Sequence, residues 1–411
     1  MSRKLFPQTA AALIAALIAV AASAPPASAQ SGATRPRRVN PQEVTREAQT
    51  PEQPAPAARP AAASPARAAA GGDTTRAYTL LQQGQFADAA REAKQVAASN
   101  PGNSEAWKIA GFAELGLKQY AEAAADLQKA RDLQRAAGDE DVPTADALAQ
   151  ALVRSDQFER ALPLLVEATS RPGKAPDAAM LYYRGLAEYR TGKAADAERS
   201  FNAAVRADPK NAISLFYLGR IAYERSQSDP AQLDAAVAAL NRATTADPRL
   251  ADAWVLLTYA YLGRAARAQQ GPKADADYLN AVRTSDALLR VRADESALVL
   301  SGQALVGAKQ YVRAVNVLER AAASPEAAGP TLYLLGVAQS RAKNFPKAVV
   351  ALERAAAKTP GDANVYRELG YAYEVSKQYA KALAAYERGA QLAPSDADFK
   401  ESAERVRPFA K

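Results

Sequence analysis

Apolar residues recur with a helical period along most of the chain. In residues 332–342, read as LYLLGVAQSRA, Leu332, Leu335 and Gln339 follow the three- to four-residue spacing of one helix face. Gly336 interrupts this pattern, and a glycine inside a helix costs about 1 kcal/mol relative to alanine. The same arrangement returns one stretch later around Gly370. Because the cost is incurred twice, we expect these glycines to serve close packing between helices.

A fixed period of 34 residues connects several further positions. Four columns of residues share it, which excludes a chance match and predicts a repeat array. The columns are Gly302, Gly336 and Gly370; Tyr311, Phe345 and Tyr379; Ala314, Ala348 and Ala382; and Pro360 and Pro394.

These columns resemble the tetratricopeptide repeat, a helix–turn–helix unit. The last full repeat, 363–396, matches its pattern closely and departs at Gly389, where alanine is usual. The matching residues are Tyr366, Leu369, Gly370, Tyr373, Tyr379, Ala382, Tyr386 and Pro394. The resemblance implies that glycine at repeat position 8 of the first helix lets the second helix, which has alanine at position 20, approach without an intervening side chain. Proline at position 32 ends the second helix, and an Asn or Asp after it is expected to cap the next one.

The resemblance implies an all-α fold, an α-solenoid of about nine such repeats that forms a right-handed superhelix. The predicted array covers residues 70–396, and the tail 397–411 is expected to form a capping helix. Repeats are expected to begin near residues 70, 104, 142, 178, 212, 251, 295, 329 and 363. The fifth repeat has about five extra residues around SQSDPAQ, and the sixth about ten around RAQQGPKADAD.

The N-terminal 69 residues differ from the array. Arg3 and Lys4 precede a short apolar run, and Ala27-Ser28-Ala29 completes the pattern of a secretory signal, so we expect cleavage before Gln30. We therefore predict a signal peptide over 1–29 and a periplasmic protein. The alternatives are an inner-membrane anchor, if the signal is uncleaved, and secretion. Residues 30–69 are rich in proline and alanine, which predicts a disordered linker.

Composition excludes whole classes of chemistry. The 411 residues include no histidine and no cysteine, which excludes disulfides, thiolate nucleophiles, Ser-His triads and zinc sites of imidazole or sulfur. No phosphate-binding loop motif is present either. We therefore expect no enzyme activity, no cofactor and no metal. The linker contributes three of the eight net positive charges, so the array is nearly balanced and a nucleic-acid partner is not expected.

The family resemblance places positions 5, 9 and 12 of each first helix on a concave groove. We call these positions the first-helix face. In the middle repeats they are aromatic, with arginines among or beside them, which suits peptides or helices of partner proteins. The aromatic residues serve either packing between neighbouring first helices or a ligand surface. The candidate groove residues are Tyr182, Tyr189, Arg190, Phe216, Arg220, Tyr223, Tyr259, Tyr333, Arg367 and Tyr371.

The predicted function is a non-catalytic scaffold of the cell envelope that binds peptide or helical segments of other proteins in this groove. One subgroup of the family clamps C-terminal carboxylates with Lys and Asn. Lys108 stands at one clamp position, but Phe112 replaces the Asn, so this clamp is not expected. The alternative function is an accessory protein of polysaccharide export or envelope assembly, since tyrosine faces also stack on sugar rings.

Overall fold

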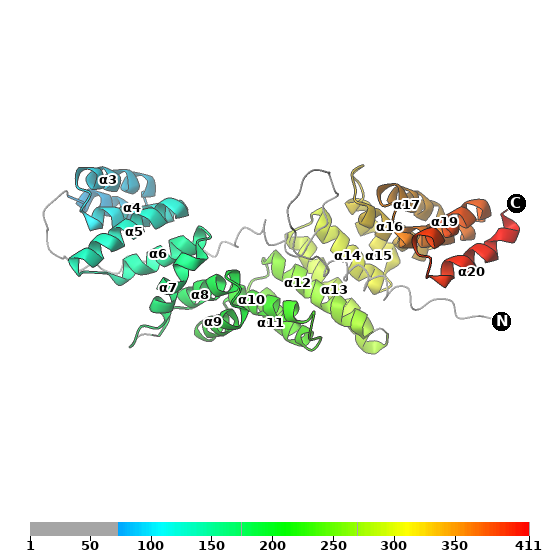
Figure 1. The fold of residues 1–411 in the computed structure, drawn as a ribbon, viewed down its shortest axis with the longest axis horizontal. Helices are drawn as coiled ribbons and strands as arrows, with labels where there is room; N and C mark the ends of the chain where they lie inside the picture. The colour runs from blue at the N-terminus through cyan, green and yellow to red at the C-terminus, as the bar shows by residue number, and fades with distance from the viewer. Residues whose placement is uncertain (1–72, 174, 269, 411) are drawn as a thin grey trace. The chain divides into compact units, whose positions relative to one another are not determined.

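The computed structural model describes residues 73–173, 175–268 and 270–410. These residues form nineteen α-helices and one short 3-10 helix, and no β-strand occurs among them (Figure 1). The expected all-α fold of paired helix–turn–helix repeats is therefore confirmed. The predicted signal peptide 1–29 and linker 30–69 lie outside the described residues.

The described chain divides into two compact units within one helix, between Ile221 and Ala222. The unit that ends at Ile221 contains α2 (Thr75–Gln82), α3 (Phe86–Ser99), α4 (Ser104–Gly116), α5 (Tyr120–Ala137), α6 (Val142–Arg154), α7 (Phe158–Thr169), α8 (Ala178–Arg190), α9 (Ala194–Ala207) and most of α10 (Ala212–Arg225).

The unit that begins at Ala222 contains the end of α10 and all later helices. These are α11 (Gln232–Ala246), α12 (Ala251–Arg267), α13 (Pro272–Val291), α14 (Glu295–Gly307), α15 (Tyr311–Ala321), α16 (Gly329–Arg341), α17 (Phe345–Lys358), α18 (Ala363–Val375), α19 (Tyr379–Leu392), α20 (Ala397–Val406) and the 3-10 helix η1 (Arg407–Phe409). No helix of the described chain is both long enough and apolar enough to cross a membrane.

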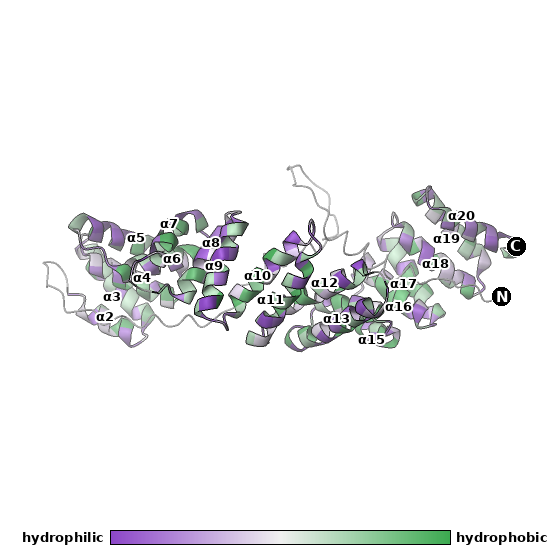
Figure 2. Cartoon of the chain, turned by 90° about the horizontal axis from the view of Figure 1, so that it is seen from below, coloured by the Kyte–Doolittle hydropathy of each residue, from purple (hydrophilic) through white to green (hydrophobic). Residues whose placement is uncertain are grey.

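Consecutive helices pack against each other within each unit, as α4 does on α5 and α16 on α17. First helices of neighbouring pairs also touch, for example α4 with α6 and α14 with α16. Each helix carries both hydrophobic and hydrophilic residues (Figure 2). In most second helices apolar residues recur on one side, which pairing buries while the polar side stays in water, whereas first helices such as α14 and α16 are buried on nearly every side.

The glycines at repeat position 8 lie directly under a side chain of the second helix. A Cβ on Gly336 would lie 2.5 Å from Leu352 Cγ, and one on Gly370 would lie 2.5 Å from a ring carbon of Tyr386. Gly111, Gly185 and Gly302 have the same relation to the residue sixteen positions later. The expectation that no side chain intervenes is therefore corrected: the glycine makes room for the large residue at position 24.

The turn inside most helix pairs has three residues, and the middle one adopts the left-handed conformation. Gly84 and Gly192 hold this place in two pairs, with φ of 73° and 78°. In five other pairs a residue with a side chain holds it: Lys118, Asp156, Lys309, Lys343 and Lys377. Since the left-handed region disfavours a Cβ by roughly 1–2 kcal/mol, the helix packing on either side imposes this turn.

Several first helices, and α20 after them, begin at polar caps. The side chains of Asn103, Asn211, Asp362 and Asp396 each accept a hydrogen bond from a backbone N–H two or three residues on. These four were the caps expected after the repeat prolines, and that expectation is confirmed. Each such cap stabilises its helix by typically about 1 kcal/mol.

The extra residues of the sixth repeat lengthen two helices. The helices α12 and α13 run for 17 and 20 residues, against 13 and 14 for α16 and α17. The guanidinium of Arg264 joins them by donating to both carboxylate oxygens of Asp277, at 2.6 and 2.8 Å. The described residues of the insertion therefore extend this pair of helices.

The last helix, α20, packs on α19. Phe399 is 1% exposed, and a Cβ on Gly389 would lie 2.1 Å from its ring. The departure from alanine at Gly389 thus has a physical reason: the glycine admits the phenylalanine that seals the end of the array.

Candidate functional site

Helices α8 and α10 bring four of the candidate residues together. The ring of Tyr217 is the centre of the cluster: it stacks on Phe201 at 5.0 Å and meets Tyr189 and Phe216 edge-on at 5.5 and 5.3 Å. Tyr182 lies 6.4 Å from the same ring. Tyr217 was missed by the sequence analysis, because it stands one residue off the positions expected to face the groove.

The cluster has a buried and a half-exposed part. Tyr182 is 7% exposed, and burial together with the neighbouring tyrosines raises its pKa well above the ordinary value. Tyr189 and Phe216 remain half-buried. The guanidinium of Arg220 lies over the ring of Tyr189, 5.3 Å from its centroid. Tyr182 therefore serves packing, whereas Tyr189, Phe216 and Arg220 form a partly accessible aromatic surface with a cation on it.

Arginine stacked on an aromatic ring recurs on this face. Arg190 is exposed and lies 5.4 Å from the ring centroid of Phe158. Such a contact contributes about 0.5–1 kcal/mol at exposed sites. It also holds the guanidinium in place, which lowers the entropy lost when the guanidinium binds a carboxylate.

In the unit that begins at Ala222, Tyr223 and Tyr259 form a second group. Both are half-buried, and burial raises the pKa of each phenol. The neighbouring Tyr259 raises that of Tyr223 further. The two hydroxyls therefore stay neutral at ordinary pH and can donate hydrogen bonds.

Tyr333 and Tyr371 differ in exposure although both stand on the expected face. Tyr333 is 5% exposed and belongs to the core, whereas Tyr371 is 38% exposed. Arg341 lies over Tyr371 at 5.9 Å and donates to both carboxylate oxygens of Glu368, at 2.9 and 3.2 Å. Arg341 was not among the candidate residues, although it directly follows the last first-helix-face position of the eighth repeat.

Arg367 has a structural task in the C-terminal cap. Its guanidinium lies 4.6 Å from the ring centroid of Phe399 and forms an ion pair with Asp396, the residue that caps α20. Arg367 therefore contributes to the packing of the last helix as well as standing on the expected face. A role of Arg367 in binding a ligand stays a prediction, as it does for the other nine candidates.

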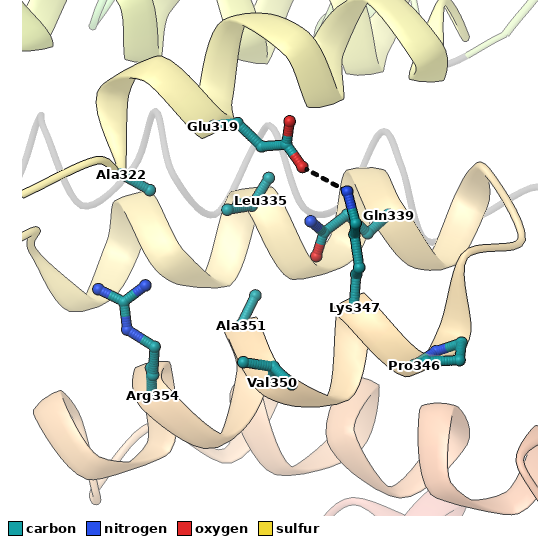
Figure 3. A pocket seen from close by; sticks show the side chains of 9 residues that line it. All are labelled: Glu319, Ala322, Leu335, Gln339, Pro346, Lys347, Val350, Ala351 and Arg354. Atoms are coloured by element: carbon teal, nitrogen blue, oxygen red, sulfur yellow. Dashed lines mark hydrogen bonds and ion pairs between the residues drawn. The ribbon is translucent and has the colours of Figure 1, made fainter.

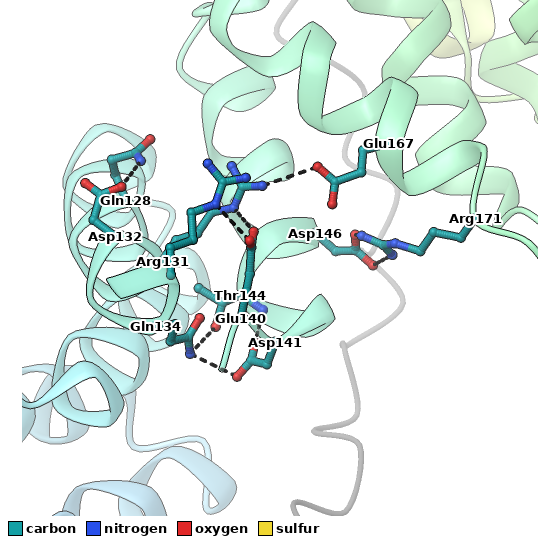
Figure 4. Close-up of polar contacts among 11 residues, drawn as sticks. Gln128, Arg131, Asp132, Gln134, Glu140, Asp141, Thr144, Asp146, Glu167 and Arg171 are labelled. Atoms are coloured by element: carbon teal, nitrogen blue, oxygen red, sulfur yellow. Dashed lines mark hydrogen bonds and ion pairs between the residues drawn. The ribbon is translucent and has the colours of Figure 1, made fainter. Parts of the chain in front are cut away.

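Helices α5, α6 and α7 are joined by a polar network around the buried Arg131 (Figure 4). Arg131 is 4% exposed, and its guanidinium donates to the carboxylates of Glu140 and Glu167. Asp141 caps α6 by accepting the backbone N–H of Thr144 at 2.7 Å. These bonds engage Glu140 and Asp141 of the acidic run at residues 138–143, and no cluster of residues suited to a metal occurs among the described residues.

Lys108, which was considered for a carboxylate clamp, and Asp146 of the following repeat are also engaged internally. Lys108 donates to Glu105 and forms an ion pair with Asp141 at 2.9 Å. Asp146 accepts two hydrogen bonds from Arg171, at 2.7 and 2.9 Å (Figure 4). Both side chains therefore stabilise contacts between helices.

Comparison with family models finds one described as the tetratricopeptide repeat, which matches residues 74–140, 147–212, 184–249 and 333–397, together more than half of the chain. Comparison with curated proteins finds no match.

Three solved structures illustrate what the chain is similar to. YrrB, a TPR protein with an unusual peptide-binding site, is 19% identical with a TM-score of 0.41, over 51% of this chain and 99% of that one. MamA from Desulfovibrio magneticus RS-1 is 22% identical with a TM-score of 0.38, over 44% and 97%. The APC/C hetero-tetramer Cut9–Hcn1 matches at 15% identity and a TM-score of 0.35, over 82% and 89%.

Proposed function

Because the chain belongs to the tetratricopeptide repeat family, a family of non-catalytic scaffolds for protein and peptide binding, we propose that it binds peptide or helical segments of partner proteins in the cell envelope. The first-helix face of α8 and α10 is the proposed site. The neighbouring helices of the same unit then support this face.

One observation carries the choice of site: Arg220 stacks on Tyr189 beside the half-buried Phe216. Aromatic and arginine side chains dominate the binding energy of protein interfaces. A guanidinium fixed on a ring can pair with a carboxylate, while the ring edges and Phe216 contact apolar side chains. A segment that combines an acidic with an apolar residue fits this chemistry.

The proposed location rests on residues 1–29. A charged start, a short apolar run and Ala27-Ser28-Ala29 support export and cleavage before Gln30. Intact-mass measurement of the protein released by osmotic shock tests this. A mature chain that begins at Gln30 is expected, and a chain that retains residues 1–29 would contradict the proposal.

The binding site is tested by photo-crosslinking in living cells. A photoreactive residue at position 216 should capture a partner that the same residue on the exposed face of α9, at position 206, does not. The captured protein is identified by mass spectrometry, and its binding segment is then titrated against purified variants.

Arg220→Ala should weaken binding of that segment by about tenfold or more, while the melting temperature stays nearly unchanged. Arg206→Ala removes the same charge from α9 and should have no effect. Unaltered affinity of the Arg220→Ala protein at both low and high salt would refute the site. If an envelope polysaccharide but no peptide binds to the same residues, the ligand of this site is a sugar and not a peptide.

A further inference from the structure

A pocket of about 470 Å³ lies between α15, α16 and α17, on the side of the second helices (Figure 3). Its apolar part is formed by Leu335, Ala322, Ala351 and Val350. Val350 is 57% exposed, so a large apolar side chain stands at the rim in contact with water.

A buried amide faces this pocket. Gln339 is 3% exposed, and its Oε1 accepts no hydrogen bond from any residue that the structure describes. In Figure 3 its amide points toward the space between Leu335 and Lys347. Because a buried polar atom without a partner destabilises the fold, such groups are rare unless a ligand or water satisfies them.

In other repeats the residue at the same position has a partner on a second helix, although Oε2 of Glu114 also lacks one within the described chain. Gln339 stands at position 11, which Glu114 holds in the second repeat and Glu188 in the fourth. Lys94 of the preceding second helix forms an ion pair with Glu114. Ser200 of the following second helix donates to Glu188 at 2.6 Å. A second helix on one side or the other thus supplies the partner.

The ninth repeat follows the same rule, because the hydroxyl of Tyr373 donates to Glu353 of the preceding second helix. In the eighth repeat the residues equivalent to Glu353 and Lys381 are Glu319 and Lys347, which pair at 3.2 Å, as the first two do at 4.0 Å. Where Ser200 stands in the fourth repeat, the following second helix has Ala351, and no residue of the described chain donates to Gln339 Oε1. The eighth repeat therefore has an open pocket where other repeats have an internal hydrogen bond.

The charges of the pocket favour an anion. Glu319 and Lys347 neutralise each other, whereas Arg354 forms no ion pair or hydrogen bond within the described chain. The ion pair is exposed at both ends, 60% for Lys347 and 41% for Glu319. It is therefore weak and can be rearranged by a bound ligand.

We propose that this pocket is a second peptide-binding site, distinct from the first-helix face. Its occupant is an extended segment of a partner protein with a carboxylate next to an apolar side chain. The carboxylate pairs with Arg354, the apolar side chain packs on Leu335 and Val350, and the amide of Gln339 hydrogen-bonds the peptide backbone. The carboxylate comes from Asp, Glu or the C-terminus of the segment.

The chain's own linker is a poorer occupant. Residues 30–69 carry six arginines and three glutamates, so their net charge has the same sign as the guanidinium of Arg354. Like charges oppose binding.

The test begins with a displayed library of random ten-residue peptides, selected on the full chain and counter-selected on its Arg354→Ala variant. Enriched peptides should combine a carboxylate with a neighbouring apolar residue. Each peptide is then resynthesised with Glu→Gln or Asp→Asn changes, and separately with an amidated C-terminus. The change that abolishes binding identifies the source of the carboxylate.

Affinities are measured by fluorescence anisotropy. Arg354→Ala should raise Kd about tenfold or more, and added salt should weaken the wild type more than this variant. Arg320→Ala is the matched control, because Arg320 holds the equivalent position of the preceding repeat, is exposed and does not line the pocket. It should leave Kd within about twofold.

Gln339→Leu separates binding from folding. It should raise Kd while the melting temperature stays level or rises, because it removes the unsatisfied amide. Arg220→Ala, on the first-helix face, should not alter Kd, so the two sites can fail independently. Three results would overturn the proposal: no enriched peptide, enriched peptides without a carboxylate, or sedimentation of a dimer that Arg354→Ala dissociates, which would make a second copy the occupant.

Discussion

Replacing Gly336 by alanine tests whether the repeat glycines exist for packing. In an isolated helix this change would stabilise by about 1 kcal/mol, because alanine has the higher helix propensity. In the protein the new Cβ would lie 2.5 Å from Leu352 Cγ and 3.4 Å from the carbonyl oxygen of Ala348. The first distance is far inside van der Waals contact, so α16 and α17 must move apart or Leu352 must leave its rotamer.

Overpacking of this kind costs typically 1–3 kcal/mol. Subtracting the propensity gain of about 1 kcal/mol leaves a net destabilisation of roughly 1 kcal/mol for Gly336→Ala. Gly336→Leu should be worse, because the added atoms must enter the same interface.

Gly263 in α12 provides a control for which the change to alanine should stabilise the protein, not destabilise it. Its nearest neighbours are the methyl groups of Leu233, 3.9 Å from where a Cβ would lie, which is ordinary contact. Gly263→Ala should therefore keep the propensity gain and stabilise by about 1 kcal/mol. The comparison isolates the room for a Cβ at each site, which Leu352 occupies at Gly336 and which is open at Gly263.

The assay is urea denaturation followed by circular dichroism, with hydrogen exchange to assign the loss to α16 and α17. A double-mutant cycle with Leu352→Ala adds a second test. The alanine at position 336 should partly fill the space that Leu352→Ala leaves, so the two destabilisations should fall short of additive by more than about 0.5 kcal/mol. If Gly336→Ala stabilises as much as Gly263→Ala, the packing explanation is refuted.

Three further changes probe other features. Burial beside Asp126 raises the pKa of Glu114 from 4.5 to about 7, so the folded protein keeps a proton that the unfolded chain releases over this interval. Stability should then fall by roughly 2–3 kcal/mol as pH rises from about 4.5 to 7, and Glu114→Gln should abolish most of this loss in urea titrations at several pH values. Lys377→Gly should stabilise by about 0.5–1 kcal/mol, because glycine adopts the left-handed turn without strain; an unchanged midpoint would contradict this. Phe399→Ala should destabilise by about 3–5 kcal/mol and raise hydrogen exchange first in α19 and α20, and uniform exchange would argue against a cap.

The periodic columns were sufficient to predict the helices, because each column reflects a local or nearest-neighbour requirement. The glycine of the first helix, the large residue sixteen positions later and the cap after the proline all lie within one 34-residue unit. The long pair α12 and α13 could not be predicted this way. Their extra residues, read as an insertion around RAQQGPKADAD, continue both helices because Arg264 and Asp277 connect them.

The candidate site was harder to predict, because partners across helices decide what a side chain does. Tyr182 and Tyr189 both stand on the first-helix face of α8, yet only Tyr189 is half-buried, whereas Tyr182 is buried. Arg220 and Arg367 both stand on the first-helix face, at positions 9 and 5 of their repeats. One stacks on Tyr189 and the other on Phe399 of the cap, and only the packed chain distinguishes them.

Position 11 suggests where a repeat array can acquire binding sites. In a solenoid each repeat contacts mainly its neighbours, so the cost of an unsatisfied group stays in one place and does not unfold the rest. Glu114 and Glu188 show that a polar residue at this position is tolerated when a neighbouring second helix supplies a partner. At Gln339 no residue of the described chain donates to the amide oxygen, which lies beside a pocket lined by second helices. A single unsatisfied polar residue at position 11 can thus leave a place for a ligand within one repeat, at a cost that stays in that repeat.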